Sequence, residues 1–221
     1  AMSKTAAGYE IREKNGLTYT FEGVAGTINQ QAKLLSIRDR NGNTLTLSYN
    51  PDNTLKDVTD GPGRKLAFTY TSGRITHIDF KNAGGTIVRS HEYVYDANDD
   101  LVAHKSPATL LDAVKNPPVT YSYYTAAADG ANLGHAMKQY TLPRGNGMQF
   151  FYYANGKTFR HRAIGPGGTD LGQEMSFTYN DFRRETVQLN ERGLTRRFFF
   201  DADGNPMQIV EENGGIREYT Y

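Results

Sequence analysis

The chain has 221 residues, and its 25 Lys and Arg nearly balance its 24 Asp and Glu, so a net charge of +1 gives no general reason to expect nucleic acid as a partner. It has no cysteine, which excludes disulfides and zinc ribbons. No run of about 18 apolar residues predicts membrane insertion, and no signal peptide is expected. With 15 Tyr, 11 Phe and 23 Gly, the composition favours an all-β protein.

The first 33 residues are the least regular part of the chain. Ala1 before Met2 is interpreted as the remnant of a cleaved expression tag. Residues 11–20 are predicted to form a β-hairpin closed by the turn at residues 14–16, since Asn-Gly is a strong turn signal. The sequence is therefore predicted to divide into an N-terminal segment, residues 1–33, and a repeat array, residues 34–221.

Aromatic residues recur along the array at the predicted ends of strands, separated by 21 to 29 residues. They are Tyr49, Tyr70, Tyr95, Tyr124, Tyr153, Tyr179, Phe200 and Tyr221. Five of them are preceded by a glycine seven residues earlier, namely Gly42, Gly63, Gly172, Gly193 and Gly214. This register predicts about seven to eight tandem units.

Within a unit, the residues before the aromatic alternate as a half-buried strand does. Leu45, Leu47 and Tyr49 are predicted to share one face of the sheet. Turn-forming residues follow the aromatics, including Asp96, Asp201 and Gly204. Return strands are predicted at residues 55–59, 74–80, 101–104, 158–164, 184–189 and 207–211.

Three longer insertions fall between the predicted strands, at residues 106–118, 126–135 and 165–170. No long helix is predicted. The expected fold is therefore a row of antiparallel β-hairpins forming a continuous, twisted and curved sheet ribbon. If Gly63 and Gly193 have positive φ, replacement of either by Val is expected to cost more than about 1 kcal/mol of folding free energy.

The repeated unit begins with Gly, followed by Asn or Arg. After five further residues comes Tyr, followed by Asp or Asn. Two residues later the unit has Gly, then any residue, then Leu. It resembles the tyrosine-aspartate (YD) repeat of the Rhs family, which is shared by bacterial insecticidal toxin complexes and teneurins. Residues 39–43, 60–64, 95–101 and 200–205 carry this resemblance most clearly, and it extends over residues 34–221. The resemblance implies a spiral shell that encloses a C-terminal toxin, in a secreted or cell-surface bacterial protein of greater length. The family's plug segment, which carries aspartate-dependent self-cleavage in many members, has no counterpart in this sequence, so the chain is interpreted as a fragment of such a shell.

The sequence gives little support for catalysis or for metal binding. Residues 201–212 superficially match a calcium loop, but Pro206 stands where that loop needs glycine. The five histidines show no spacing typical of metal ligands. No serine elbow or phosphate loop is present. No cofactor, no metal and no enzymatic activity are therefore expected.

Basic residues interleaved with aromatics suggest one further site. They are Arg160, Arg162, Arg183, Arg184, Arg196 and Arg197. Such a pattern suits acidic sugars or nucleic acids, but charged residues on a strand more often cover sheet edges and solvated faces. The leading hypothesis is a non-catalytic shell module whose partners are neighbouring repeats and an enclosed toxin. The alternative is a cell-surface module that binds carbohydrate or protein through exposed Tyr and Arg faces.

Overall fold

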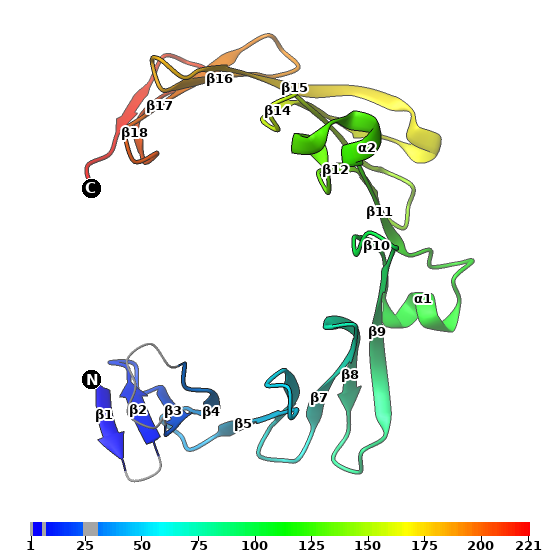
Figure 1. Ribbon diagram of the computed structural model, residues 1–221, viewed down its shortest axis with the longest axis vertical. Coiled ribbons are helices and arrows are strands. Elements are labelled where there is room, and N and C mark those ends of the chain that lie inside the picture. Colours follow the sequence, from blue (N-terminus) through cyan, green and yellow to red (C-terminus); the bar gives the residue numbers. More distant parts are fainter. Residues whose placement is uncertain (1, 6–7, 24–30) are drawn as a thin grey trace. The chain divides into compact units, whose positions relative to one another are not determined.

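Within each of the two units of this protein, the described strands pair antiparallel with the next strand in the sequence, as Figure 1 shows. The computed structural model describes residues 2–5, 8–23 and 31–221, so the proposed tag remnant Ala1 lies outside it. The all-β prediction of tandem hairpins is confirmed. The chain divides into unit 1, residues 1–94 with 105–111, and unit 2, residues 95–104 with 112–221.

Unit 1 is a meander in which each described strand pairs with the next. Its strands are β1 (Met2–Thr5), β2 (Gly8–Arg12), β3 (Thr18–Glu22), β4 (Leu34–Arg38), β5 (Thr44–Tyr49), β6 (Leu55–Thr59), β7 (Lys65–Thr71), β8 (Arg74–Lys81) and β9 (Ile87–Tyr95). The short helix α1 (Pro107–Leu111) also belongs to it. Strands β2 and β3 form a hairpin where one was expected, and β3 pairs with β4, so the meander extends N-terminal to residue 34.

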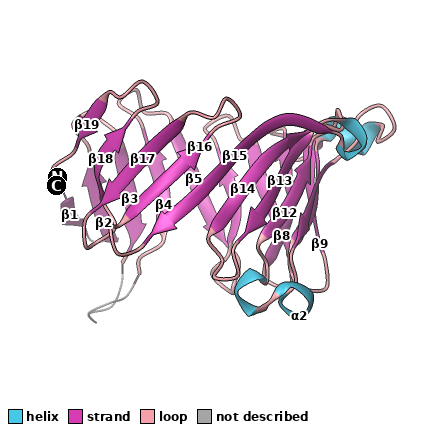
Figure 2. Cartoon of the chain, turned by 90° about the horizontal axis from the view of Figure 1, so that it is seen from above, coloured by secondary structure: helices cyan, strands magenta, loops and turns pink. Residues whose placement is uncertain are grey.

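Unit 2 repeats the same arrangement. Its strands are β10 (Leu101–Lys105), β11 (Val119–Tyr123), β12 (Met137–Thr141), β13 (Gly147–Tyr152), β14 (Thr158–Ile164), β15 (Asp170–Asn180), β16 (Glu185–Leu189), β17 (Thr195–Phe200), β18 (Pro206–Val210) and β19 (Ile216–Glu218). The predicted insertions hold short helices, namely α2 (Ala126–Asp129), η1 (Ala131–Leu133) and η2 (Pro166–Gly168). Figure 2 shows α2 at the strand ends.

Most hairpin turns of both units share one geometry, which the turn of residues 39–43 illustrates. The Asp39 N–H donates to the Asn43 carbonyl at 3.0 Å, and the N–H of Gly42 donates to the Asp39 carbonyl at 3.2 Å. Gly42, the fourth residue, has a φ of 86°, a conformation that glycine adopts without steric cost. The predicted glycines that hold this fourth position are Gly42, Gly63, Gly193, Gly204 and Gly214.

Gly172 occupies a different place from the other four glycines of the seven-residue register. It lies inside β15, where its N–H donates to Asp170 Oδ1 at 2.8 Å. The turn nearest to it is closed earlier in the chain, by the Gly165 N–H bonding the Thr169 carbonyl at 2.8 Å. Since the sequence register cannot tell a turn glycine from a strand glycine, it assigned Gly172 to the turn set.

A β-bulge interrupts the simple alternation expected near the strand-ending aromatics. Ser48 lies opposite Asp57 and Tyr49 opposite Leu55, so Lys56 is an extra residue in β6. The register shifts in the same way at Tyr70, Tyr123, Tyr152 and Phe200. Because a bulge increases local twist and redirects side chains, these aromatics do not simply continue the face of the preceding strand residues.

Very little of the molecule is a buried core. Among the described residues, the buried hydrophobic ones are Ala67, Leu133 and Ile164. The chain exposes 14,633 Å² of surface, whereas a compact protein of this mass exposes about 10,000 Å². Most strand residues are therefore half-buried by their neighbours within a single layer, and much of the surface of both faces remains accessible.

Candidate functional site

The strand-ending tyrosines form a recurring hydrogen bond that we name the tyrosine latch. In each latch the hydroxyl at the end of one strand donates to the carbonyl of the first residue of the preceding strand. The pairs, with their O–O distances, are Tyr49–Leu34 (2.7 Å), Tyr70–Leu55 (2.9 Å), Tyr123–Leu101 (2.9 Å), Tyr152–Met137 (2.9 Å) and Tyr179–Thr158 (3.0 Å). A latch ties the ends of two neighbouring strands together, and at Tyr49, Tyr70, Tyr123 and Tyr152 it lies beside a bulge.

At two positions the tyrosine that forms the latch lies one residue before the aromatic that the sequence register selected. Tyr124 and Tyr153 were predicted to end their strands, but Tyr123 and Tyr152 hold the latch position. The hydroxyls of Tyr124 and Tyr153 instead bond forward, to the carbonyls of Phe150 in β13 and Phe177 in β15, both at 3.0 Å. The sequence signal for this arrangement is a pair of adjacent tyrosines. The first hydroxyl bonds the preceding strand, and the second bonds a strand later in the chain.

The remaining aromatic positions of the predicted register are Tyr95, Phe200 and Tyr221. Tyr95 is the last residue of β9, and Asp96 opens the following turn by accepting the N–H groups of Asn98 and Asp100 at Oδ1. Phe200 ends β17 without a hydroxyl to donate. Tyr221 lies beyond β19 and is 79% exposed, so it does not end a strand as predicted.

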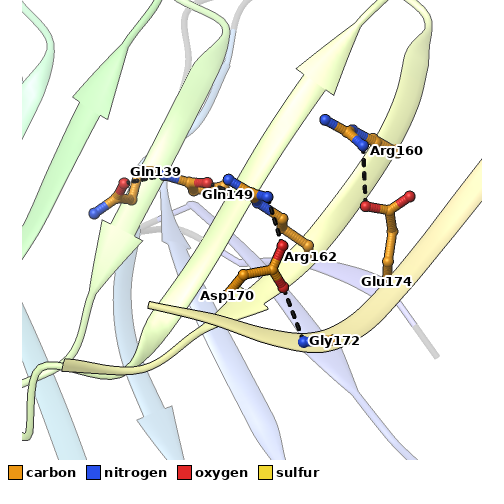
Figure 3. A network of polar contacts seen from close by, with 7 residues as sticks. All are labelled: Gln139, Gln149, Arg160, Arg162, Asp170, Gly172 and Glu174. Carbon is orange, nitrogen blue, oxygen red and sulfur yellow. Dashed lines mark hydrogen bonds and ion pairs between the residues drawn. The ribbon is translucent and has the colours of Figure 1, made fainter. Parts of the chain in front are cut away.

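Arg160 and Arg162 lie on one face of β14, in the network of Figure 3. Arg162 donates from Nε to Gln149 at 2.9 Å and pairs with Asp170 at 2.6 Å. Arg160 pairs with Glu174 at 3.1 Å, and its guanidinium lies 4.3 Å from the centre of the Phe151 ring. Both cations are therefore matched by carboxylates on β15.

The other predicted arginines do not extend this face into one basic surface. Arg197 bonds the buried Glu185 through Nε at 2.6 Å, and Arg196 pairs with Glu211. As neighbours in β17, Arg196 and Arg197 point to opposite faces. Arg183 and Arg184 stand in the turn before β16, where Arg184 has a φ of 49°. The arrangement gives alternating charge pairs rather than an anion-binding patch.

The opposite face of β12 to β15 carries a row of rings. Tyr140, Phe150, His161 and Phe177 follow one another with centroid separations of 6.2, 6.2 and 5.7 Å. Burial lowers the pKa of His161 below its ordinary value, so the imidazole is neutral at pH 7. The row packs as an apolar strip across four strands.

The aspartates at the turns are engaged by their own turns. Asp201, the first residue of the calcium-like sequence, accepts the N–H groups of Asp203 and Asn205 at Oδ1, each at 2.9 Å. Its other oxygen accepts from the Asn205 side chain at 3.0 Å. In the part of the chain that the structure describes, no three His, Asp or Glu side chains gather as a metal site. Within those same residues, no helix has the length and apolar character needed to cross a bilayer.

Comparison with known proteins identifies the fold alone. No family model and no curated protein sequence matches the chain. The fold is similar to part of a chain in the Photorhabdus luminescens Tc holotoxin pore, at 12% identity and a TM-score of 0.51, over 88% of this chain and 12% of that one.

Two further solved structures give the same result. The TcdB2–TccC3–TEV crystal structure matches at 11% identity and a TM-score of 0.50, over 95% of this chain and 14% of the other. TcdB2–TccC3 without its hypervariable C-terminal region matches at 12% identity and 0.50, over 87% and 12%. This chain thus spans a small part of the length of each chain it matches, and the class it shares with them is the antiparallel β-repeat fold.

Proposed function

We propose that this chain is a non-catalytic section of the wall of an Rhs or YD-repeat shell, which encloses a C-terminal toxin. The observation that carries the proposal is the tyrosine latch, repeated in both units together with a common turn. Because the latch and the turn join successive strands in the same way, a wall of such strands requires no buried core. Similarity of fold to parts of Tc toxin chains supports the same role.

The chemistry of the faces also suits a wall. Arg160, Arg162 and Arg197 are each neutralised by a carboxylate of a neighbouring strand, so they present little net charge to a ligand. This pairing weakens the alternative, in which exposed Tyr and Arg faces bind cell-surface glycans or another protein. The proposed partners are neighbouring repeats of one longer polypeptide and the enclosed toxin, in a secreted or cell-surface bacterial protein.

The absence of cysteine offers a direct test of enclosure. Leu45 and Thr46 are adjacent exposed residues of β5 that point to opposite faces. In the complete natural polypeptide, Leu45→Cys and Thr46→Cys each add one thiol to this cysteine-free section, and mass spectrometry of the peptide that contains it follows its reaction with maleimide. A closed wall predicts that one of the two thiols reacts slowly and the other rapidly.

Unfolding in urea serves as the control, because both thiols should then react alike. Equal and rapid labelling of the two folded variants would contradict the shell proposal, because a sheet that encloses nothing leaves both faces open. A second result would favour the alternative, a glycan-binding module. In that case neither thiol is protected, and the chain binds glycans with an affinity that Arg160→Ala or Arg162→Ala abolishes.

A further inference from the structure

A cavity of about 630 Å³ lies in unit 2, between the turn that begins at Asp96 and the insertion that follows β11. It is lined by Asn98 and Asp100 from the turn, by Tyr124 and Thr125, and by His135 at the end of the insertion. Alanines of α2 and η1 form its apolar side. Its volume is within the range of small-molecule sites, about 300–1,000 Å³.

A histidine–aspartate pair joins the two sides of this cavity. His135 Nδ1 lies 2.9 Å from Asp100 Oδ1, although the two residues are 35 positions apart. The Asp100 side chain is 12% exposed, and that of His135 is 67% exposed. Since a carboxylate only accepts hydrogen bonds, the Nδ1–H of His135 donates to it, which leaves Nε2 for another partner. The pair therefore fixes the orientation of an imidazole that is largely exposed to solvent.

The backbone at His135 indicates that its side chain has a role. His135 has a φ of 65°, a left-handed conformation that costs a residue with a Cβ of the order of 1 kcal/mol. The neighbouring Gly134, which would adopt it freely, has a φ of −53°. A glycine at position 135 would remove this strain. The backbone conformation alone therefore favours glycine over histidine at this position.

The groups around the cavity match one class of ligand. The second carboxylate oxygen of Asp100 accepts hydrogen bonds and the Asn98 amide donates, while Nε2 of His135 and the Thr125 hydroxyl can each bond a hydroxyl group. The Tyr124 ring and the alanine methyl groups offer an apolar surface beside them. A ring that carries hydroxyls on its edge and C–H groups on its face satisfies both kinds of contact.

We propose that this cavity binds a saccharide unit. The site shares no residue with the predicted basic set, Arg160 to Arg197, and it goes beyond the proposed wall function, which does not require it. The thiol-labelling experiment and the binding experiment below therefore succeed or fail independently of each other.

The test is a titration of the whole 221-residue chain, with its histidine rings isotopically labelled for NMR. The probes are the methyl glycosides of glucose, galactose, mannose and N-acetylglucosamine. We expect at least one of them to shift the His135 signals saturably, with a Kd of about 1 mM or tighter. His77 and His161 in the same sample report on non-specific effects.

Two variants with matched controls decide the assignment. Asp100→Asn should weaken binding at least about tenfold, whereas Asp181→Asn, which removes an exposed carboxylate paired with Lys157, should leave it unchanged. His135→Gly should abolish binding while it preserves or raises stability. Asn53→Gly relieves a similar left-handed residue, with φ 70°, far along the sequence and should leave binding intact.

The proposal is overturned if no probe shifts the His135 signals saturably. It is also overturned if His135→Gly or Asp100→Asn binds as the parent protein does, because the pair would then serve only to hold the insertion. Equal weakening by Asp181→Asn would show a general charge effect and would overturn it as well.

Discussion

Units 1 and 2 have the same turns and the same latches, but their polar faces carry different chemistry. Unit 1 contains the short cross-strand pair Ser90–Asp79 at 2.6 Å beside the longer pair Lys105–Glu92 at 2.8 Å. In unit 2 arginines make such pairs, as in Arg162–Asp170 and Arg160–Glu174. The apolar faces differ as well, since unit 1 places Ile37 opposite Leu45, whereas unit 2 carries the row of rings around His161.

The difference shows which parts of the repeat are constrained. The turn and the latch involve backbone groups, so they recur wherever the chain must reverse with the same geometry. The face residues contact only their cross-strand neighbours, so they can change in pairs without altering the wall. The following predictions test this division between shared joints and independent faces, from the largest expected effect to the smallest.

The largest difference between the units is expected at the one fully buried large side chain described. Ile164 of unit 2 has no exposed surface, so Ile164→Ala should lower the free energy of unfolding by about 2–5 kcal/mol. Ile87, which belongs to unit 1 and is 52% exposed, provides the control, and Ile87→Ala should cost clearly less. Urea unfolding of both variants measures the difference. Equal losses would mean that unit 2 has no stronger core than unit 1.

The turn glycines should behave alike in the two units. Gly63 and Gly193 have φ values of 88° and 74°, so Gly63→Val and Gly193→Val should each cost more than about 1 kcal/mol. No atom lies within 4 Å of a Cβ built on Gly193, so its cost comes from the backbone and not from a clash. Gly193→Asn is the control, because Asn53 holds the same turn position. Neutral behaviour of both valine variants by thermal unfolding would contradict the assignment of the turns.

The latches should also contribute equally in both units. Tyr70→Phe in unit 1 and Tyr179→Phe in unit 2 each remove one hydroxyl bonded to a backbone carbonyl, which should cost about 0.5–1.5 kcal/mol. Tyr221→Phe removes an exposed hydroxyl and should have no effect. Chemical denaturation measures all three. A cost in only one unit would show that the latch is not a common joint.

The smallest effect is expected from the acidic turn residues. Hydrogen bonds from the Asn43 side chain to Asp39, and from the Asn205 side chain to Asp201, lower the pKa of each aspartate below its ordinary value. Since the folded state binds the proton more weakly than the unfolded state, these carboxylates stabilise the fold above about pH 4. That contribution should disappear as the pH falls through the lowered pKa. Thermal unfolding between about pH 5 and 2 should show a shallower pH dependence for Asp39→Asn and Asp201→Asn than for the parent chain.

Much of the fold follows from local patterns in the sequence. The alternation of apolar and polar residues, together with Asn, Asp and Gly at fixed offsets, places strands and turns correctly because both depend on residues close together in the chain. The return strands at residues 55–59 and 158–164 agree with β6 and β14 at both ends. The same locality explains why no long helix was expected and none occurs among the described residues.

The register of the tyrosines depended on more than local pattern. A doublet such as Tyr152–Tyr153 offers two candidates for one strand end. Only the bulge at Phe159, between Thr158 and Arg160, decides which of the two hydroxyls bonds the preceding strand. Gly172 shows the same limit, because a positive φ inside a strand has no distinct sequence signal. Cross-strand pairing settles both cases.

By itself, the sequence determined the class of this protein, the hairpin repeat and the chemistry of its turns, since those depend on contacts within a few residues. Only the tertiary structure decided which arginines are neutralised, because Arg162 meets Asp170 through strand pairing. Likewise, it alone brought His135 to Asp100 across 35 residues and formed a cavity between them. Sequence order carries no information about such pairs, because the length of an insertion and the register of a sheet fix which distant side chains meet.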